Sequence, residues 1–182
     1  MIDNNAFCYN HKRVKAIVLG ADPGNFSDHG NSVEIKVAFA IGSGDARYFD
    51  AILKNLSSVG LSITDVYVQN LITCNPGFET STNPDWEKLA DQQLSERVYE
   101  FNQLDPNNKI PVLVTAERIL KYLALKKMPE AEILYTNSLY HPIPPSLNKL
   151  NRRIYPFFRN PKYSLNKDSW IPYREMLAEI FV

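Results

Sequence analysis

The sequence predicts an α/β protein with a parallel sheet covered by helices on both faces. Short apolar runs rich in Val, Ile, Leu and Tyr alternate along the chain with amphipathic segments of helical period. Strands buried on both faces are apolar nearly throughout, and their alternation with helices is typical of parallel sheets. The chain has 182 residues, which suits one compact unit, so we expect a single domain over residues 1–182.

Short apolar runs with β-rich composition are the predicted strands. They span residues 15–20 (KAIVLG), 65–69 (DVYVQ), 111–115 (PVLVT) and 132–136 (EILYT). Connections between parallel strands cross over through helices that pack on the sheet. We therefore expect three layers, α/β/α, around a central four-stranded parallel sheet.

The helices are predicted from apolar positions three and four residues apart. They span residues 46–59, 84–104, 116–125 and about 169–181. Asn83 is the expected N-cap of the second helix, with Pro84 at its first position. Thr115 is the expected cap of the third helix, and Asp168 or Ser169 that of the last.

Composition excludes several classes of protein. Lys and Arg together number 20, as do Asp and Glu, so no global field attracts nucleic acid and any such binding depends on local charge. No apolar run reaches the length of a membrane span and the polar start is no signal peptide, so we expect a cytoplasmic protein. Cys8 and Cys74 are too few for a four-cysteine metal or iron–sulfur site, and no disulfide is expected.

Each predicted strand is followed by a polar side chain. Asp22 follows the first strand, Asn70 the second, Thr115 the third and His141 the fourth. Ligands of such sheets bind outside the carboxyl ends of the strands, so we expect these side chains to meet on one rim. The long, turn-rich segment 73–83 is also typical of functional loops.

Two of these residues lie in stiff loops. Pro23 holds Asp22 extended and Gly24 permits a sharp turn, so the carboxylate can be fixed to activate a water. His141 is flanked by prolines, and a fixed neutral imidazole can donate a hydrogen bond to a developing anion. Taken alone, a residue like Asp22 is more often an ordinary turn aspartate, and a residue like His141 is more often a structural loop histidine.

Asn70 and Phe39 have features that suit a nucleobase. The amide of Asn70 carries donors and an acceptor that match a pyrimidine edge, and Phe39 can stack on a base. In isolation, an Asn at a strand end is usually a cap or turn residue, and core packing explains Phe39 at least as well as stacking does.

A basic segment follows the last predicted strand. Residues 133–167 contain no acidic side chain, and aromatic residues are interleaved with its cations. The cations are Lys149, Arg152, Arg153, Arg159, Lys162 and Lys167. The segment is either a phosphate-binding patch or a solvated basic loop over an aromatic cluster, and the sequence favours neither.

These segments resemble the motifs of the uracil-DNA glycosylase superfamily. Residues 20–24 (GADPG) resemble its Gly-x-(Asp/Asn)-Pro-(Tyr/Gly) loop, and residues 141–146 (HPIPPS) resemble its His-Pro-Ser-Pro loop. Residues 37–40 (VAFA) are similar to the segment of the stacking phenylalanine, and 68–71 (VQNL) to the strand end of the base-reading asparagine. With the segment after the second loop, the resemblance covers residues 15–170 and keeps the motif order of the family.

The resemblance implies a uracil-DNA glycosylase-like fold and a DNA-repair enzyme. The enzyme would flip uracil or a related deaminated base into a pocket and hydrolyse its N-glycosidic bond through an oxocarbenium-like transition state. Asp22 would position water and His141 would stabilise the departing base. Phe39 would stack on the base and Asn70 would read its edge. The remaining pocket residues would be Ala21, Pro23 and Gly24.

The resemblance also implies a DNA partner and a monomer that needs no metal or cofactor. The residues that would contact DNA are Ser146, Leu147, Lys149, Arg152 and Arg153. Leu147 would supply the apolar wedge, because Pro145 stands where the family has leucine. Gly24 in place of tyrosine implies a wider pocket, and Ile143 in place of serine removes a phosphate contact.

Two other functions remain open on the sequence. Ile143 and Pro145 would suit a member of the same fold that is catalytically weak or inactive and binds nucleic acid or a nucleobase. The zero net charge would suit a hydrolase of small nucleosides or other glycosides.

Overall fold

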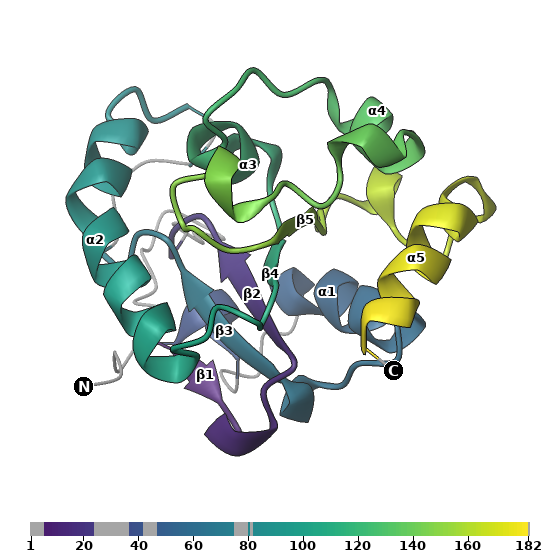
Figure 1. Ribbon diagram of the computed structural model, residues 1–182, viewed down its shortest axis with the longest axis horizontal. Coiled ribbons are helices and arrows are strands. Elements are labelled where there is room, and N and C mark those ends of the chain that lie inside the picture. Colours follow the sequence, from purple (N-terminus) through teal and green to yellow (C-terminus); the bar gives the residue numbers. More distant parts are fainter. Residues whose placement is uncertain (1–5, 24–36, 42–46, 75–79, 81, 182) are drawn as a thin grey trace.

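A five-stranded, mostly parallel sheet forms the centre of the molecule (Figure 1). The computed structural model describes residues 6–23, 37–41, 47–74, 80 and 82–181. The strand order is β1-β3-β2-β4-β5. The strands are β1 (Phe7–Cys8), β2 (Ala16–Gly20), β3 (Val66–Asn70), β4 (Val112–Val114) and β5 (Ile154–Pro156). All neighbouring pairs are parallel except β1 with β3, so the predicted α/β class is confirmed.

The first three predicted strands are present as β2, β3 and β4. Their residues are buried along their whole length, which explains why they are apolar nearly throughout. The antiparallel edge strand β1 adds a fifth strand to the predicted four.

The fourth predicted strand was wrong, because residues 132–136 lie in the helix α4 (Ala131–Thr136). Ala131, Leu134 and Tyr135 are buried whereas Glu132 and Ile133 are exposed. This spacing of i, i+3 and i+4 is that of a helix face, and a short apolar run does not distinguish the two patterns. The fourth parallel strand is instead β5, which pairs with β4.

Helices lie on both sides of the sheet (Figure 1). They are α1 (Arg47–Ser58), α2 (Trp86–Leu104), α3 (Glu117–Leu123), α4 and α5 (Ile171–Phe181). In Figure 1, α2 and α3 lie on one side of the strands and α1 and α5 on the other. The four predicted helices are therefore confirmed to within a few residues. No helix in the described ranges is long and apolar enough for a bilayer span.

Two of the predicted helix caps were wrong. Asn83 lies one turn before α2, where its Oδ1 accepts a hydrogen bond from the backbone N–H of Asp85 at 2.9 Å. The hydroxyl of Thr115 donates to the carbonyl of Leu19 at 3.0 Å, which joins the ends of β4 and β2, and Ala116 precedes α3. At α5, Asp168 and Ser169 lie in a 3₁₀ turn, Asp168–Trp170, that leads into the helix.

Candidate active site at the carboxyl edge of the sheet

The ends of β2 and β3 bring Asn70 and Phe39 together at Gly20. Gly20 is paired with Asn70 in the sheet register. A Cβ atom on Gly20 would overlap Oδ1 of Asn70 and the ring of Phe39. Only glycine therefore lets the amide and the ring meet over the end of β2. Two of the predicted base-binding residues are neighbours in the structure.

Phe39 is held in an unusual backbone conformation. Its φ and ψ are 59° and 21°, and Ala40 follows with a φ of 55°. Such left-handed geometry is costly for residues other than glycine and is concentrated at ligand sites. The ring is buried and lies 5.4 Å from that of Phe49 on α1. Packing against α1 thus fixes the ring over Gly20.

A buried polar network anchors the strand end that carries Asn70. The backbone N–H of Asn70 donates to Oε1 of Gln69 at 2.8 Å, and Nε2 of Gln69 donates to Glu100 on α2 at 3.2 Å. The same Glu100 oxygen accepts the hydroxyl of Tyr67, and Arg97 forms an ion pair with Glu100. Sequence reasoning missed this network. The sequence feature that could have indicated it is the pair Arg97 and Glu100, two charged residues three positions apart on a helix predicted to pack on the sheet.

The two carboxylate oxygens of Asp22 have different surroundings. Its Oδ2 accepts hydrogen bonds from the hydroxyl of Thr80 at 2.7 Å and from the indole N–H of Trp86 at 2.8 Å. Its Oδ1 is buried and has no hydrogen-bond partner in the described part of the chain. Burial raises the pKa of Asp22 above its ordinary value, although Thr80, Trp86 and the charges of Arg159 and Arg118 oppose this effect. The carboxylate is therefore fixed in orientation through Oδ2, while Oδ1 has no partner among the described residues.

Arg118 on α3 holds both donors of Asp22 in place. Its guanidinium donates to the carbonyl of Thr80, and to that of Asn83 at 2.9 Å. The same group lies 5.0 Å from the centroid of the Trp86 ring. The sequence analysis missed Trp86 and Arg118, whereas Thr80 belongs to the segment 73–83 that it singled out as a functional loop.

A cavity of about 490 Å³ opens at the carboxyl ends of β4 and β5. Thr115, Phe158, Arg159 and Tyr163 contribute to its walls. The backbone N–H of Arg159 donates to the carbonyl of Thr115 at 3.0 Å, so the segment after β5 is fixed to the end of β4. Because β2, β4 and β5 are parallel, and Asp22 follows β2 whereas Arg159 follows β5, the cavity and the carboxylate lie on the same edge of the sheet.

The remaining residues of the first loop lie around Asp22. Ala21 is half-buried and its carbonyl accepts the backbone N–H of Ile72 at 2.9 Å, while Pro23 is buried. Gly24 lies outside the described residues.

His141 lies beside β5, away from the strand end of Asp22. Ile143 pairs antiparallel with Ile154, which places His141 along the outer edge of β5. Because β4 separates β5 from β2 and neighbouring strands are about 4.8 Å apart, His141 is at least about 10 Å across the sheet from β2. The physical reason is that residues 132–136 are a helix, so His141 does not follow a central strand.

The imidazole of His141 is kept neutral by its surroundings. Its ring centroid lies 4.6 Å from that of Tyr173, and burial lowers the pKa of His141. Its Nδ1 is buried and, within the ranges that the structure describes, has no hydrogen-bond partner.

Arg152 is not available to DNA, which corrects the sequence prediction. Its side chain is fully buried, and its guanidinium donates to the carboxylate of Asp105 at 2.8 Å. It also donates to the carbonyls of Phe101 and Asp105, each at 2.7 Å. These groups form the carboxyl end of α2, where helical carbonyls lack partners. Arg152 is therefore a structural residue that completes α2.

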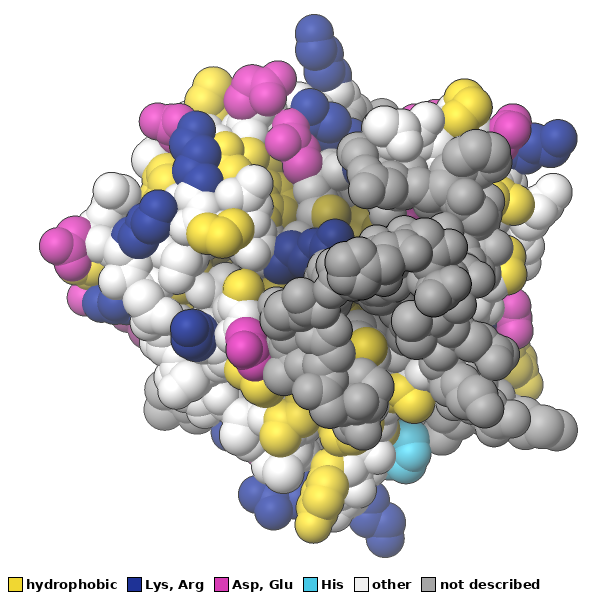
Figure 2. Space-filling view, turned by 180° about the vertical axis from the view of Figure 1, so that it is seen from behind, with side chains coloured by type: hydrophobic (Ala, Val, Ile, Leu, Met, Phe, Trp, Pro, Cys, Tyr) yellow, Lys and Arg dark blue, Asp and Glu magenta, His cyan; other side chains and the backbone are white. Residues whose placement is uncertain are grey.

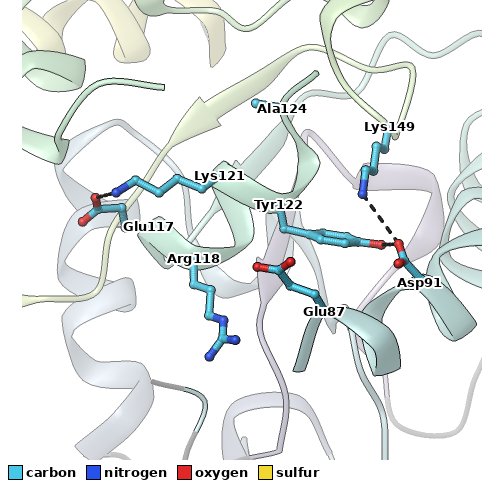
Figure 3. Close-up of a pocket in the computed structure, with 8 residues that line it drawn as sticks. All are labelled: Glu87, Asp91, Glu117, Arg118, Lys121, Tyr122, Ala124 and Lys149. Carbon is cyan, nitrogen blue, oxygen red and sulfur yellow. Dashed lines mark hydrogen bonds and ion pairs between the residues drawn. The ribbon is translucent and has the colours of Figure 1, made fainter. Parts of the chain in front are cut away.

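Lys149 and Arg153 are both engaged with other groups of the protein. Lys149 lies between α2 and α3, with its Nζ 3.6 Å from the Tyr122 ring centroid and 3.6 Å from Asp91, as Figure 3 shows. Arg153 is exposed, but it immediately precedes β5 and donates to the carbonyl of Lys109 at 3.1 Å. A residue before a parallel strand lies at the amino edge, opposite Asp22.

Ser146 and Leu147 lie in a 3₁₀ turn, Pro145–Leu147. Ser146 is exposed, whereas Leu147 is half-buried and packs against the core. The carbonyl of Leu147 accepts the backbone N–H of Leu125 at 2.9 Å. Leu147 thus stabilises the connection after α3 in this structure.

No protein-family model matches the chain, and no curated protein matches its sequence. The structure defines the class of the protein as mixed α/β, with a five-stranded, mostly parallel sheet. Within the described ranges, no three His, Cys, Asp or Glu side chains are grouped as metal ligands.

Proposed function

We propose that the protein is a DNA-repair glycosylase that hydrolyses the N-glycosidic bond of uracil or a related deaminated base. The observation that carries this proposal is the group formed by Asn70, Phe39 and Asp22. Asn70 and Phe39 meet over Gly20, and Asp22, whose Oδ1 has no partner among the described residues, follows two residues after Gly20. An amide, an aromatic ring and a fixed carboxylate are the groups that reading, stacking and hydrolysing a flipped base require.

In the proposed reaction, the base enters the carboxyl edge after leaving the DNA stack. Phe39 stacks on its face and Asn70 hydrogen-bonds its edge. The bond from the sugar C1′ to the base nitrogen breaks, and its electron pair leaves with the base. Asp22 offsets the positive charge of the sugar and orients the water whose oxygen bonds to C1′. The base accepts a proton, and the products are a free base and an abasic sugar.

His141 remains in the proposal as the donor to the departing base. Its lowered pKa leaves it neutral, and a neutral imidazole can donate a hydrogen bond without an added charge. For this role, the loop 141–146 must move toward β2 when DNA binds.

Measurement of base release tests the proposal directly. The substrates are oligonucleotides that carry uracil in a single strand, in U·A and U·G pairs, and hypoxanthine. We expect release from at least one of them, with a loss of about 10²-fold or more on Asp22→Asn. If the wild-type chain releases no base from any of them, the proposal is wrong.

A member of the fold that binds nucleic acid without cleaving it is the second candidate. Ile143 favours it, because this residue is buried and pairs with Ile154 as a packing element of the second loop. Salt-sensitive binding of uracil-containing DNA without base release would select this candidate. Turnover of free nucleosides without DNA affinity would indicate a nucleoside hydrolase.

A further inference from the structure

We propose that Arg159 binds a backbone phosphate of the DNA strand, beside the cavity at the carboxyl ends of β4 and β5. This inference rests on the proposed function and names the residue that holds the strand next to the cleaved nucleotide. It replaces the phosphate contacts that the sequence assigned to Arg152 and Arg153.

The position of Arg159 favours a contact close to the reacting sugar. Arg153 and Arg159 are both exposed and flank β5, one before the strand and one after it. Only the residue after the strand lies on the edge of Asp22. The hydrogen bond from its backbone N–H to Thr115 fixes Arg159 there at 3.0 Å.

The guanidinium of Arg159 differs from those of the other arginines of the site and basic segment in its contacts. Arg118 and Arg153 direct their guanidinium groups to backbone carbonyls, and Arg152 is paired with Asp105. In the described part of the chain, the Arg159 side chain forms no hydrogen bond or ion pair. Its planar fork of donors matches the oxygens of a phosphate.

The other cations of the basic segment are engaged with the protein. The Nζ of Lys162 lies 3.2 Å from the carboxylate of Glu132, and the Nζ of Lys167 donates to the carbonyl of Lys162 at 3.4 Å. Figure 2 shows basic and acidic side chains interspersed on the face that it displays, with no broad cationic area in the coloured part. With these cations engaged, a single arginine explains a phosphate contact better than an extended patch does.

The cavity suits the sugar that is attached to such a phosphate. Phe158 and Tyr163 supply apolar walls, and the cavity of about 490 Å³ has room for a deoxyribose ring. Glu117 is the acidic residue of its lining, and its charge is offset by Lys121 at 2.6 Å. Repulsion of the phosphate by this wall is thereby reduced.

The salt dependence of DNA binding tests this role. The probe is a single-stranded oligonucleotide with one 2′-fluoro-2′-deoxyuridine. Because its glycosidic bond resists hydrolysis, binding can be measured without mutation of the active site. Affinity is measured over a range of salt concentrations for the wild type and for Arg159→Gln, Arg153→Gln and Arg13→Gln. Arg13 is an exposed arginine in the turn before β2 and is the matched control for loss of one charge.

We expect Arg159→Gln to reduce the slope of log K against log salt by about 0.7, the loss of one phosphate contact on a single strand. Arg13→Gln and Arg153→Gln should keep the wild-type slope, and Arg159→Lys should restore it. The phosphates that flank the lesion are also replaced by neutral methylphosphonates, one at a time. At the position that Arg159 contacts, the replacement should leave the wild type and Arg159→Gln with the same salt slope.

The inference is overturned if Arg159→Gln keeps the wild-type slope, or if Arg153→Gln lowers the slope as much. Thermal unfolding of each variant shows whether it is folded. If Arg159→Gln does not fold, the salt slope of Arg159→Lys is compared with that of the wild type instead. A wild-type protein that releases uracil but fails the Arg159 test refutes this inference alone. A wild-type protein that neither binds nor cleaves the oligonucleotides refutes the proposed function.

Discussion

At the scale of single residues, the site depends on Gly20 as much as on the groups with chemical function. The absence of a side chain at Gly20 lets Asn70 and Phe39 occupy one space at the end of β2. The sequence analysis named Asn70 and Asp22 because each follows a clear strand, and Phe39 because residues 37–40 resemble a family segment. It did not predict Trp86 or Arg118, because their contacts with the Asp22 region join residues far apart in the chain.

Replacement of Gly20 by alanine should disrupt the site and the packing together. The added methyl overlaps Asn70 and Phe39, and overpacking of this kind costs about 1–3 kcal/mol. We expect a lower free energy of unfolding in denaturant and loss of base release. Gly60→Ala is the matched control, because Gly60 has a φ of 77° but open space around it, so only stability should fall. A Gly20→Ala variant with full activity would show that Asn70 and Phe39 need not meet.

The raised pKa of Asp22 predicts the direction of two pH effects. The working carboxylate is lost as pH falls through a pKa above its ordinary value of 3.8, so base release should decline at a higher pH than an exposed aspartate would give. The effect of Asp22 ionisation on the free energy of unfolding has the opposite sign to its effect on activity. A folded-state pKa above the unfolded value means that ionisation at higher pH destabilises the fold.

Asp22→Asn should therefore raise the midpoint of thermal unfolding at neutral pH while it abolishes activity. The asparagine Oδ1 can still accept from Thr80 and Trp86. The gain should disappear below the folded-state pKa of Asp22, where the wild-type group is neutral as well. A variant less stable than the wild type at neutral pH would contradict this account.

At the scale of elements, most helices and central strands were predictable, whereas β5 and α4 were not. The helices α1, α2 and α5 and the buried strands β2 and β3 follow from their patterns. The strand β5 has three residues and ends in Pro156, so no periodic signal marks it. In α4, six residues carry an apolar run that fits either a strand or a helix, and only packing selects the helix.

The contact of α3 with the segment 80–86 predicts a positioning role for Arg118. Arg118→Met removes the donor to Thr80 and Asn83 and one of the charges that lower the pKa of Asp22. We expect lower activity and an acid limb of the pH–rate profile displaced to higher pH, with partial recovery in Arg118→Lys. Lys126→Met, at an exposed lysine after the same helix, is the control and should leave the profile unchanged. Reduced activity with an unmoved acid limb would mean that Arg118 acts on folding alone.

The carboxyl end of α2 predicts that Arg152 stabilises the fold and does not bind DNA. Arg152→Met leaves the carboxylate of Asp105 and the last carbonyls of α2 without their donor. Breaking a buried ion pair costs about 3–5 kcal/mol, so denaturant unfolding should show a loss of that order. The fraction that remains folded should bind DNA with the wild-type salt slope. Normal stability with a reduced slope would restore the sequence prediction.

At the scale of the whole molecule, the sheet topology determines where polar groups gather, and the net charge determines the general attraction for DNA. The parallel strands collect the ends of β2, β3, β4 and β5 on one edge, which concentrates the polar groups there. The net charge of zero gives no general attraction for DNA. We therefore expect weak affinity for undamaged duplex DNA, and recognition that depends on the flipped base and its adjoining backbone.

The most direct test of the central claim is single-turnover release of uracil from a single-stranded oligonucleotide, with enzyme in excess. The account predicts release by the wild type, loss of about 10²-fold or more in Asp22→Asn, and clear reductions in Asn70→Ala and Phe39→Ala. Gly60→Ala should release uracil at the wild-type rate under conditions where it is folded. Equal rates in the wild type and Asp22→Asn would contradict the account, because the carboxylate at the end of β2 would then have no part in the reaction.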